Sequence, residues 1–187
     1  MTSVINRYAA FVDRDGVINL DSGYIGRPSD FVFAPGAKAA LARLHAAGYL
    51  LVVVTNQSGI ARGYYTMADF AAVTAYMCAE LAAVGAPVAQ VEHCPHLPAD
   101  LQPVSFACAC RKPKPGMILS AAEALGIDVS QSILVGDKSD DIAAGRAAGV
   151  GRCFLIGADV KNGEAGADAT FSDLAHCVDG LLGVATL

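Results

Sequence analysis

An apolar run ends in two carboxylates and a glycine within the segment Tyr8-Ala9-Ala10-Phe11-Val12-Asp13-Arg14-Asp15-Gly16. A run of this kind is typical of a strand buried on both faces of a parallel sheet. Asp13 falls at the carboxyl end of this strand, the edge where open α/β sheets bind ligands. Two such carboxylates need a counter-charge, and a divalent cation supplies it. The segment therefore predicts a metal-assisted nucleophile, Asp13, with an acid/base helper, Asp15, although Asp-x-Asp-Gly also occurs in ordinary strand-to-turn junctions.

Similar apolar runs alternate with helical patterns along the rest of the chain. We expect strands at residues 8–12, 50–54, 88–92, 132–135 and 152–156, and helices at residues 37–47, 67–84, 115–125, 139–148 and 174–182. Thr66, with Asp69 three residues on, is the expected N-cap of the second helix. The alternation predicts an α/β fold, with a Rossmann-like parallel sheet between two helical layers. Irregular segments are expected at 20–34, 94–115 and 158–167, and the first two should shape the site.

The composition sets the broad class of the protein. A chain of 187 residues fits one domain, 1–187, and 54% hydrophobic with 17% charged residues predicts a sizeable core. The net charge of −5 argues against nucleic acid and anionic membranes as partners. No apolar stretch approaches the roughly 20 residues of a membrane helix. Because the first residues also lack a signal-peptide core, we expect a cytoplasmic protein. Nothing in the sequence suggests an oligomer, so we expect a monomer.

Three further segments follow expected strands or precede expected helices. Thr55-Asn56-Gln57-Ser58-Gly59 offers hydroxyl, amide and backbone donors for phosphoryl oxygens, but it is also typical of a polar turn. The segment 111–114 is the densest basic part of the chain, either a site or a solvated cluster. Asp137 ends the fourth strand and would share Mg²⁺ with Asp13 if the two strands are neighbours. At least one of Asp140 and Asp141 is expected to be an ordinary first-turn helix acid.

Four metal-ligating side chains cluster in the loop 94–110. Cys94, His96, Cys108 and Cys110 form a Cys₃His set, which predicts a closed, structural zinc site that pins the loop. A redox pair of Cys108 and Cys110, or simple loop composition, remains open. The other three cysteines are expected to be small buried apolar residues: Cys78, Cys153 and Cys177.

In this order, the four strand-end and loop segments resemble the motifs of the haloacid dehalogenase superfamily of phosphatases. Asp13 and Asp15 match its first motif, Thr55 the second, Lys112 the third and Asp137 the fourth. The resemblance implies that Asp13 forms an aspartyl-phosphate and that Asp15 is the general acid and base. It implies Mg²⁺ on Asp13, Asp137 and the backbone carbonyl of Asp15, with Thr55 and Lys112 holding the phosphoryl oxygens. It also implies a capless enzyme, since the intervals between the motifs hold no separate cap domain.

Within the superfamily, the zinc loop resembles a bacterial branch that removes the C7 phosphate of a heptose 1,7-bisphosphate. The matching text includes Ser58-Gly59-Ile60-Ala61-Arg62-Gly63 and Cys110-Arg111-Lys112-Pro113. The resemblance implies a set of substrate contacts, with Arg111 as the specificity residue: Asp21, Ser22, Gly23, Tyr24, Thr55, Asn56, Gln57, Ser58, Arg111, Lys112 and Lys138.

Several alternatives remain beside the heptose bisphosphate reading. A similar zinc loop occurs in the histidinol-phosphate phosphatase branch, which is the nearest rival. A phosphomutase is chemically close and poorly discriminated by sequence. A Mg²⁺-dependent phosphoacceptor receiver domain would retain phosphate on aspartate and show little turnover, and a zinc-bound interaction module would be non-catalytic.

Overall fold

The computed structural model describes residues 7–101, 108–157 and 163–183. Its centre is a six-stranded parallel sheet in the order β3-β2-β1-β4-β5-β6. The strands are β1 (Ala9–Val12), β2 (Leu50–Asn56), β3 (Val88–Cys94), β4 (Ile133–Gly136), β5 (Arg152–Ile156) and β6 (Ala169–Phe171). The helices are α1 (Ala37–Ala46), α2 (Met67–Ala82), α3 (Gly116–Leu125), α4 (Ser139–Ala148) and α5 (Leu174–Leu182). The predicted three-layer α/β fold is therefore confirmed.

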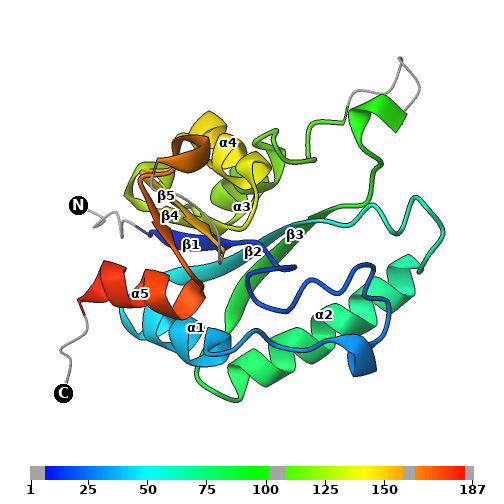
Figure 1. Ribbon diagram of the computed structural model, residues 1–187, viewed down its shortest axis with the longest axis horizontal. Helices are drawn as coiled ribbons and strands as arrows, with labels where there is room; N and C mark the ends of the chain where they lie inside the picture. Colours follow the sequence, from blue (N-terminus) through cyan, green and yellow to red (C-terminus); the bar gives the residue numbers. More distant parts are fainter. Residues whose placement is uncertain (1–6, 102–107, 158–162, 184–187) are drawn as a thin grey trace.

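Helices cover both faces of the sheet (Figure 1). α1, α2 and α5 pack on one face, and α3 and α4 pack on the other. Side chains of β1 alternate between these layers, because Ala10 and Val12 join one core cluster whereas Ala9 and Phe11 join the other. The strand is therefore apolar on both faces, which is why its sequence is a continuous apolar run.

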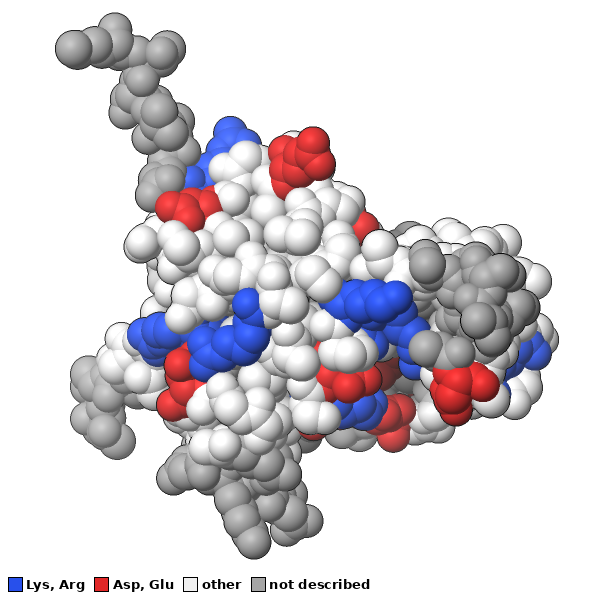
Figure 2. Space-filling view, turned by 90° about the horizontal axis from the view of Figure 1, so that it is seen from above, with Lys and Arg blue, Asp and Glu red and all other residues white. Residues whose placement is uncertain are grey.

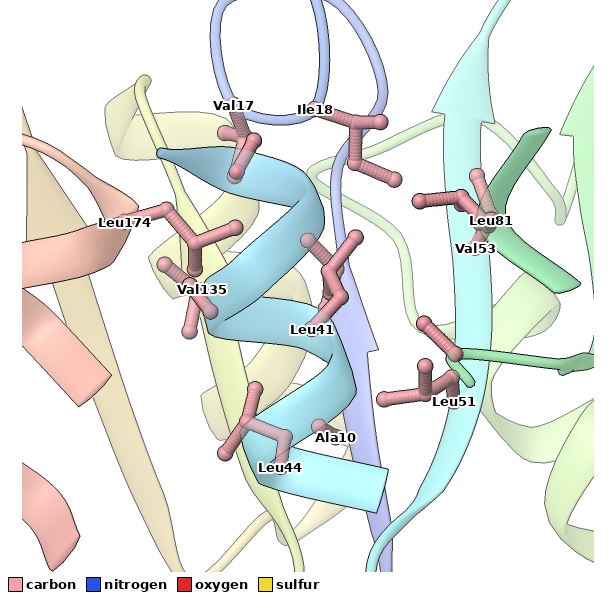
Figure 3. Packing of buried hydrophobic residues seen from close by; sticks show 14 of the residues in the cluster. Ala10, Val17, Ile18, Leu41, Leu44, Leu51, Val53, Leu81, Val135 and Leu174 are labelled. Atoms are coloured by element: carbon pink, nitrogen blue, oxygen red, sulfur yellow. The ribbon is translucent and has the colours of Figure 1, made fainter. Parts of the chain in front are cut away.

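The larger core cluster lies under α1. Leu41 and Leu44 of this helix are fully buried, and Figure 3 shows them among side chains of β1, β2 and β4. Burying a leucine of this kind contributes about 1.5–3 kcal/mol. The core thus fixes α1 over the central strands, and with it the loop that follows β1.

The expected elements are all present, with differences at their ends. β2 and β3 run on into polar residues, where Thr55 pairs with His93 and Asn56 with Cys94. α2 begins with the predicted capping box, in which the side chains of Thr66 and Asp69 each accept a bond from the other's backbone N–H. The short edge strand β6 has no counterpart among the expectations. Parts of the irregular segments, residues 102–107 and 158–162, lie outside the described residues.

The charged side chains form small groups on the surface. Figure 2 shows Lys and Arg side chains next to Asp and Glu side chains on one face, with uncharged surface between the groups. Within the ranges that the structure describes, no helix is both long and apolar enough to cross a membrane.

Candidate active site

Three neighbouring strands deliver polar residues to one edge of the sheet. β1 lies between β2 and β4, so the condition for Asp13 and Asp137 to share a cation, that the first and fourth strands are neighbours, is met. The backbone N–H of Asp13 donates to the carbonyl of Val135 at 3.0 Å, which extends the pairing of β1 and β4 by one step. Thr55 and Asn56 end β2 on the other side. Asp13, Thr55 and Asp137 thus emerge side by side.

Lys112 lies between two buried carboxylates. Its Nζ is 2.9 Å from Asp13 Oδ1 and 2.6 Å from Asp141 Oδ1, and it donates to the carbonyl of Val54 at 2.8 Å. Burial lowers the pKa of Lys112, but the two carboxylates outweigh this effect and raise it. Burial raises the pKa of Asp13 to about 7, with Lys112 lowering it and Asp141 raising it. The single ammonium of Lys112 therefore does not offset the burial of Asp13 and the charge of Asp141.

The acidic group at this edge can accept a cation. Carboxylate oxygens of Asp13, Asp137 and Asp141 lie within 4.8 Å of one another. Burial raises the pKa of Asp137, and among the described residues its Oδ1 has no hydrogen-bond partner. A Cβ added to Gly16 would lie 2.3 Å from Asp137 Oδ2, so the backbone after Asp15 passes directly beside this carboxylate. A group of oxygen donors with one orphaned atom fits Mg²⁺.

Asp15 points its carboxylate into a separate set of hydrogen bonds. Its oxygens accept from Arg14 at 2.9 to 3.2 Å, from Asn19 Nδ2 at 3.0 Å and from Gln57 Nε2 at 2.8 Å. Arg14 is 1% exposed. Its guanidinium lies 5.8 Å from the centroid of the Phe70 ring. The Asp15 carboxylate is thus held in place beside the Asp13 site rather than inside the acidic group.

A cavity of about 450 Å³ opens over these residues. The predicted catalytic residues Asp13, Asp15, Thr55 and Lys112 all line it. The predicted substrate contacts also line it, except Ser22: Asp21, Gly23, Tyr24, Thr55, Asn56, Gln57, Ser58, Arg111, Lys112 and Lys138. Lys138 Nζ lies 3.3 Å from Asp21 Oδ2 and 3.6 Å from Asp137 Oδ2, so it links the loop after β1 to the acidic group.

The four predicted zinc ligands also meet. The sulfur atoms of Cys94, Cys108 and Cys110 and Nδ1 of His96 are 3.0 to 3.5 Å apart in every pair. They form a nearly regular tetrahedron, somewhat smaller than the edges of about 3.8 Å that zinc–sulfur bonds of about 2.3 Å require. All three cysteines are free thiols. The set fits a closed metal site, and His93 stacks on Phe70 outside it.

This cluster is bonded to the basic segment of the cavity. The backbone N–H of Arg111 donates to Cys108 Sγ at 3.4 Å, and Arg111 Nη1 donates to the carbonyl of His96 at 3.1 Å. The next residue, Lys112, exchanges two 3.1 Å hydrogen bonds with the side chain of Asn56 at the end of β2. The loop therefore carries its two cations to the sheet edge.

Sequence reasoning missed three residues of this site. Asp141 was within the fourth motif but was weighed as a helix acid; it is buried, pairs with Lys112 and accepts from the backbone N–H groups of Asp137 and Lys138. Arg14 and Tyr65 belong to the Asp15 network and carry no local pattern that predicts their contacts. Asp140, by contrast, is exposed at the cavity rim.

Known proteins resemble this chain in sequence and in structure. The HAD-hydrolase-like family model matches residues 109–182. A Vibrio cholerae protein named D-glycero-beta-D-manno-heptose-1,7-bisphosphate 7-phosphatase is 47% identical over 149 residues, 79% of this chain and 80% of that protein. A Photorhabdus laumondii protein named as the phosphatase of the alpha anomer is 43% identical over 148 residues, 79% of this chain and 81% of that protein.

A solved structure agrees with these relatives. The D,D-heptose 1,7-bisphosphate phosphatase from B. bronchiseptica, complexed with magnesium and phosphate, has a TM-score of 0.81 and 34% identity. The match covers 94% of this chain and 98% of that one. The prediction of a phosphoric monoester hydrolase is thereby confirmed, in preference to a receiver domain or an interaction module. The chain belongs to the heptose-1,7-bisphosphate 7-phosphatase family of haloacid dehalogenase-like hydrolases.

Proposed function

We propose that this enzyme removes the C7 phosphate of D-glycero-D-manno-heptose 1,7-bisphosphate through an aspartyl-phosphate on Asp13. The observation that carries the proposal is the position of Asp13 at the end of β1, 2.9 Å from the Lys112 ammonium and beside Asp137. The names of the relatives support the substrate, and the magnesium and phosphate in the B. bronchiseptica structure support the chemistry.

The reaction has two steps. Asp13 attacks phosphorus, the bond from phosphorus to the C7 oxygen breaks, and Asp15 gives its proton to the leaving oxygen. Water then attacks the aspartyl-phosphate, Asp15 takes a proton from that water, and inorganic phosphate leaves with Asp13 regenerated. Thr55 and Lys112 hold the phosphoryl oxygens during both steps, and Asp141 holds Lys112.

Mg²⁺ would be held by Asp13, Asp137 and the backbone carbonyl of Asp15, where it supplies positive charge to the phosphoryl oxygens. The raised pKa of Asp13 supports this requirement, because a buried carboxylate needs such a charge to remain ionised as a nucleophile.

Substrate selection rests with the loops around the cavity. Arg111 grips the second phosphate of the bisphosphate, as a planar guanidinium can. Cys94, His96, Cys108 and Cys110 would hold Zn²⁺, and Cys108 Sγ and the His96 carbonyl hold Arg111 in position by accepting its hydrogen bonds. The sugar is contacted by the cavity-lining residues Asp21, Gly23, Tyr24, Asn56, Ser58 and Lys138.

We further infer one phosphatase domain, 1–187, with the zinc-binding loop 94–110 inserted, acting as a cytoplasmic monomer. The support for a monomer is that one chain supplies the two proposed catalytic carboxylates, Asp13 and Asp15, and the cations Arg111, Lys112 and Lys138 of the cavity. Analytical ultracentrifugation tests this state.

Phosphate release with Mg²⁺ tests the function. Both anomers of heptose 1,7-bisphosphate are compared with histidinol phosphate, because the relatives are named for either anomer. We expect strong turnover of one anomer and a loss of about 10³-fold or more in the Asp13→Asn enzyme. Preference for histidinol phosphate would move the enzyme to the rival branch, and transfer of phosphate to a second sugar hydroxyl would identify a mutase.

A further inference from the structure

Tyr65 lies in a slot that fixes its ring. It is 7% exposed, follows β2 and borders the cavity. Two glycines leave room for it: a Cβ on Gly59 would lie 2.2 Å from Tyr65 Cε1, and a Cβ on Gly26 would lie 2.8 Å from Tyr65 Cβ. The hydroxyl is therefore aimed in one direction.

That hydroxyl donates to the side chain of Gln57. Gln57 Oε1 accepts from Tyr65 OH at 2.5 Å and from Arg14 Nη2 at 3.1 Å. Its Nε2 donates to Asp15 Oδ2 and to Thr55 Oγ1, both at 2.8 Å. An amide has two acceptor positions and two N–H donors, so Gln57 uses all four in this orientation. A flipped amide would place its oxygen against the Asp15 carboxylate.

Gln57 Oε1 has two donors, Tyr65 and Arg14, and only the Arg14 donor is shared with other acceptors. Arg14 Nη2 has two hydrogens but faces three acceptors, which are Gln57 Oε1 at 3.1 Å and the two Asp15 oxygens at 3.0 and 2.9 Å. Burial raises the pKa of Tyr65 to about 12, so the hydroxyl keeps the proton that it donates. Arg14 therefore gives Gln57 Oε1 only a shared hydrogen bond, at the longest of these three distances.

We propose that Tyr65 is a positioning residue, which fixes the orientation of the Gln57 amide and thereby holds the Asp15 carboxylate in place for proton transfer. The inference rests on the acid/base role of Asp15 in the proposed function. Because Asp15 acts on the leaving oxygen and not on bound phosphate, the loss of this support lowers kcat and leaves KM nearly unchanged.

Removal of the single hydroxyl tests the inference. In the Tyr65→Phe enzyme we expect aspartyl-phosphate formation in a single turnover to slow about tenfold, the value of one well-placed hydrogen bond, with KM within about twofold. The matched control is Tyr76→Phe, which removes the same atom from a ring that packs against Phe31 and Phe33. The control should react like the wild type.

A double-mutant cycle separates positioning from general support of the fold. In an Asp15→Asn background, Tyr65→Phe should slow the same step less than about threefold, because its effect passes through Asp15. Gln57→Glu keeps the shape of the side chain but turns a donor into an acceptor, and it should also slow the step at similar KM.

The outcomes are distinguishable. If Asp15→Asn leaves the rate unchanged, the acid/base role fails and the inference fails with it. If Asp15→Asn slows the step but Tyr65→Phe and Gln57→Glu do not, Tyr65 has no positioning role. An equal loss from Tyr65→Phe in both backgrounds also overturns the inference, since it would show a structural effect only.

Discussion

Lys112 is the residue on which the charge balance of the site depends. It is 3% exposed and neutralises part of the charge of Asp13 and Asp141. We predict that Lys112→Met lowers kcat at least about 100-fold, because a cation beside the phosphoryl group is lost. Without Mg²⁺, the free energy of unfolding should fall by about 3 kcal/mol, as expected when one partner of a buried ion pair is removed.

Urea unfolding with and without Mg²⁺ checks this prediction. Mg²⁺ should stabilise the Lys112 variant more than the wild type, because the ion meets carboxylates that have lost their ammonium partner. The control is Lys38→Met, which breaks the pair between Lys38 and Glu80 on partly exposed helix surfaces and should cost less than about 1 kcal/mol. Equal losses in both variants would contradict the special position of Lys112.

Asp168 makes the stability of the protein depend on pH. Its carboxylate accepts from the backbone N–H of Cys153 at 2.6 Å and pairs with Arg146 at 2.8 Å. Partial burial raises the pKa of Asp168, but the hydrogen bonds from Arg146 and Cys153 outweigh it and lower the pKa below the usual 3.8. A lowered folded-state pKa stabilises the protein above the unfolded value, and this contribution is lost as the pH falls through the folded value.

We therefore predict that Asp168→Asn destabilises the protein at about pH 7 and not at acid pH. Because more than a third of the side chain is exposed, solvent screening limits the effect to about 1 kcal/mol or less. Chemical unfolding at about pH 7 and about pH 3 measures the difference. A gap between variant and wild type that stays the same at both pH values would refute this account.

Among single residues, the sequence was sufficient to predict those site residues whose position is set by the end of a strand. Asp13 and Asp137 follow apolar runs, and such runs end at the binding edge of a parallel sheet. Asp141 was not distinguished from Asp140, because an acid in the first turn of a helix satisfies the helix dipole whether or not it also meets a buried lysine. Tyr65 and Arg14 act through contacts in space, which no spacing along the chain encodes.

Among the elements, the loop with the Cys₃His set has the most specific consequence. Its cluster bonds directly to Arg111, through Cys108 Sγ and the carbonyl of His96. We predict that removal of zinc by a chelator, or Cys110→Ser, raises KM for the bisphosphate about tenfold or more and lowers kcat less, because Arg111 loses its support.

Steady-state kinetics and metal analysis check this prediction together. The wild type should contain one zinc per chain and Cys110→Ser should contain little. Cys78→Ser is the matched control, since Cys78 lies on α2 outside the cluster. Loss of zinc with an unchanged KM would contradict the prediction, because it would show that the cluster does not support substrate binding by Arg111.

The elements themselves were predictable where burial sets their period. β1, β2 and β4 are apolar on both faces, and this pattern identifies them. The polar end of β2 was not predicted, since Thr55 and Asn56 continue the strand only because β3 pairs with them. β6 has three half-buried residues at the sheet edge, and so short a run gives little periodicity to detect.

For the molecule as a whole, the alternation of strands and helices sufficed to predict the layers but not the sheet order. That order places β1 between β2 and β4, so the chain runs outward from β1 to β3 and then crosses to the other side. The cavity opens over this crossing. A sequence pattern shows which segments are strands, whereas the neighbours of each strand depend on how the helices pack over the whole sheet.

The position of β1 also has a consequence for biosynthesis. Asp13 is on β1, which leaves the ribosome before β2 to β6, whereas Lys112, Asp137 and Asp141 follow only after β3. The four side chains of the Cys₃His set are divided in the same way, two before and two after residues 102–107. Because a domain generally folds as a unit during synthesis, a nascent chain holds the Asp13 carboxylate long before its counter-charge. We therefore expect the growing chain to have no phosphatase activity until β4 docks beside β1.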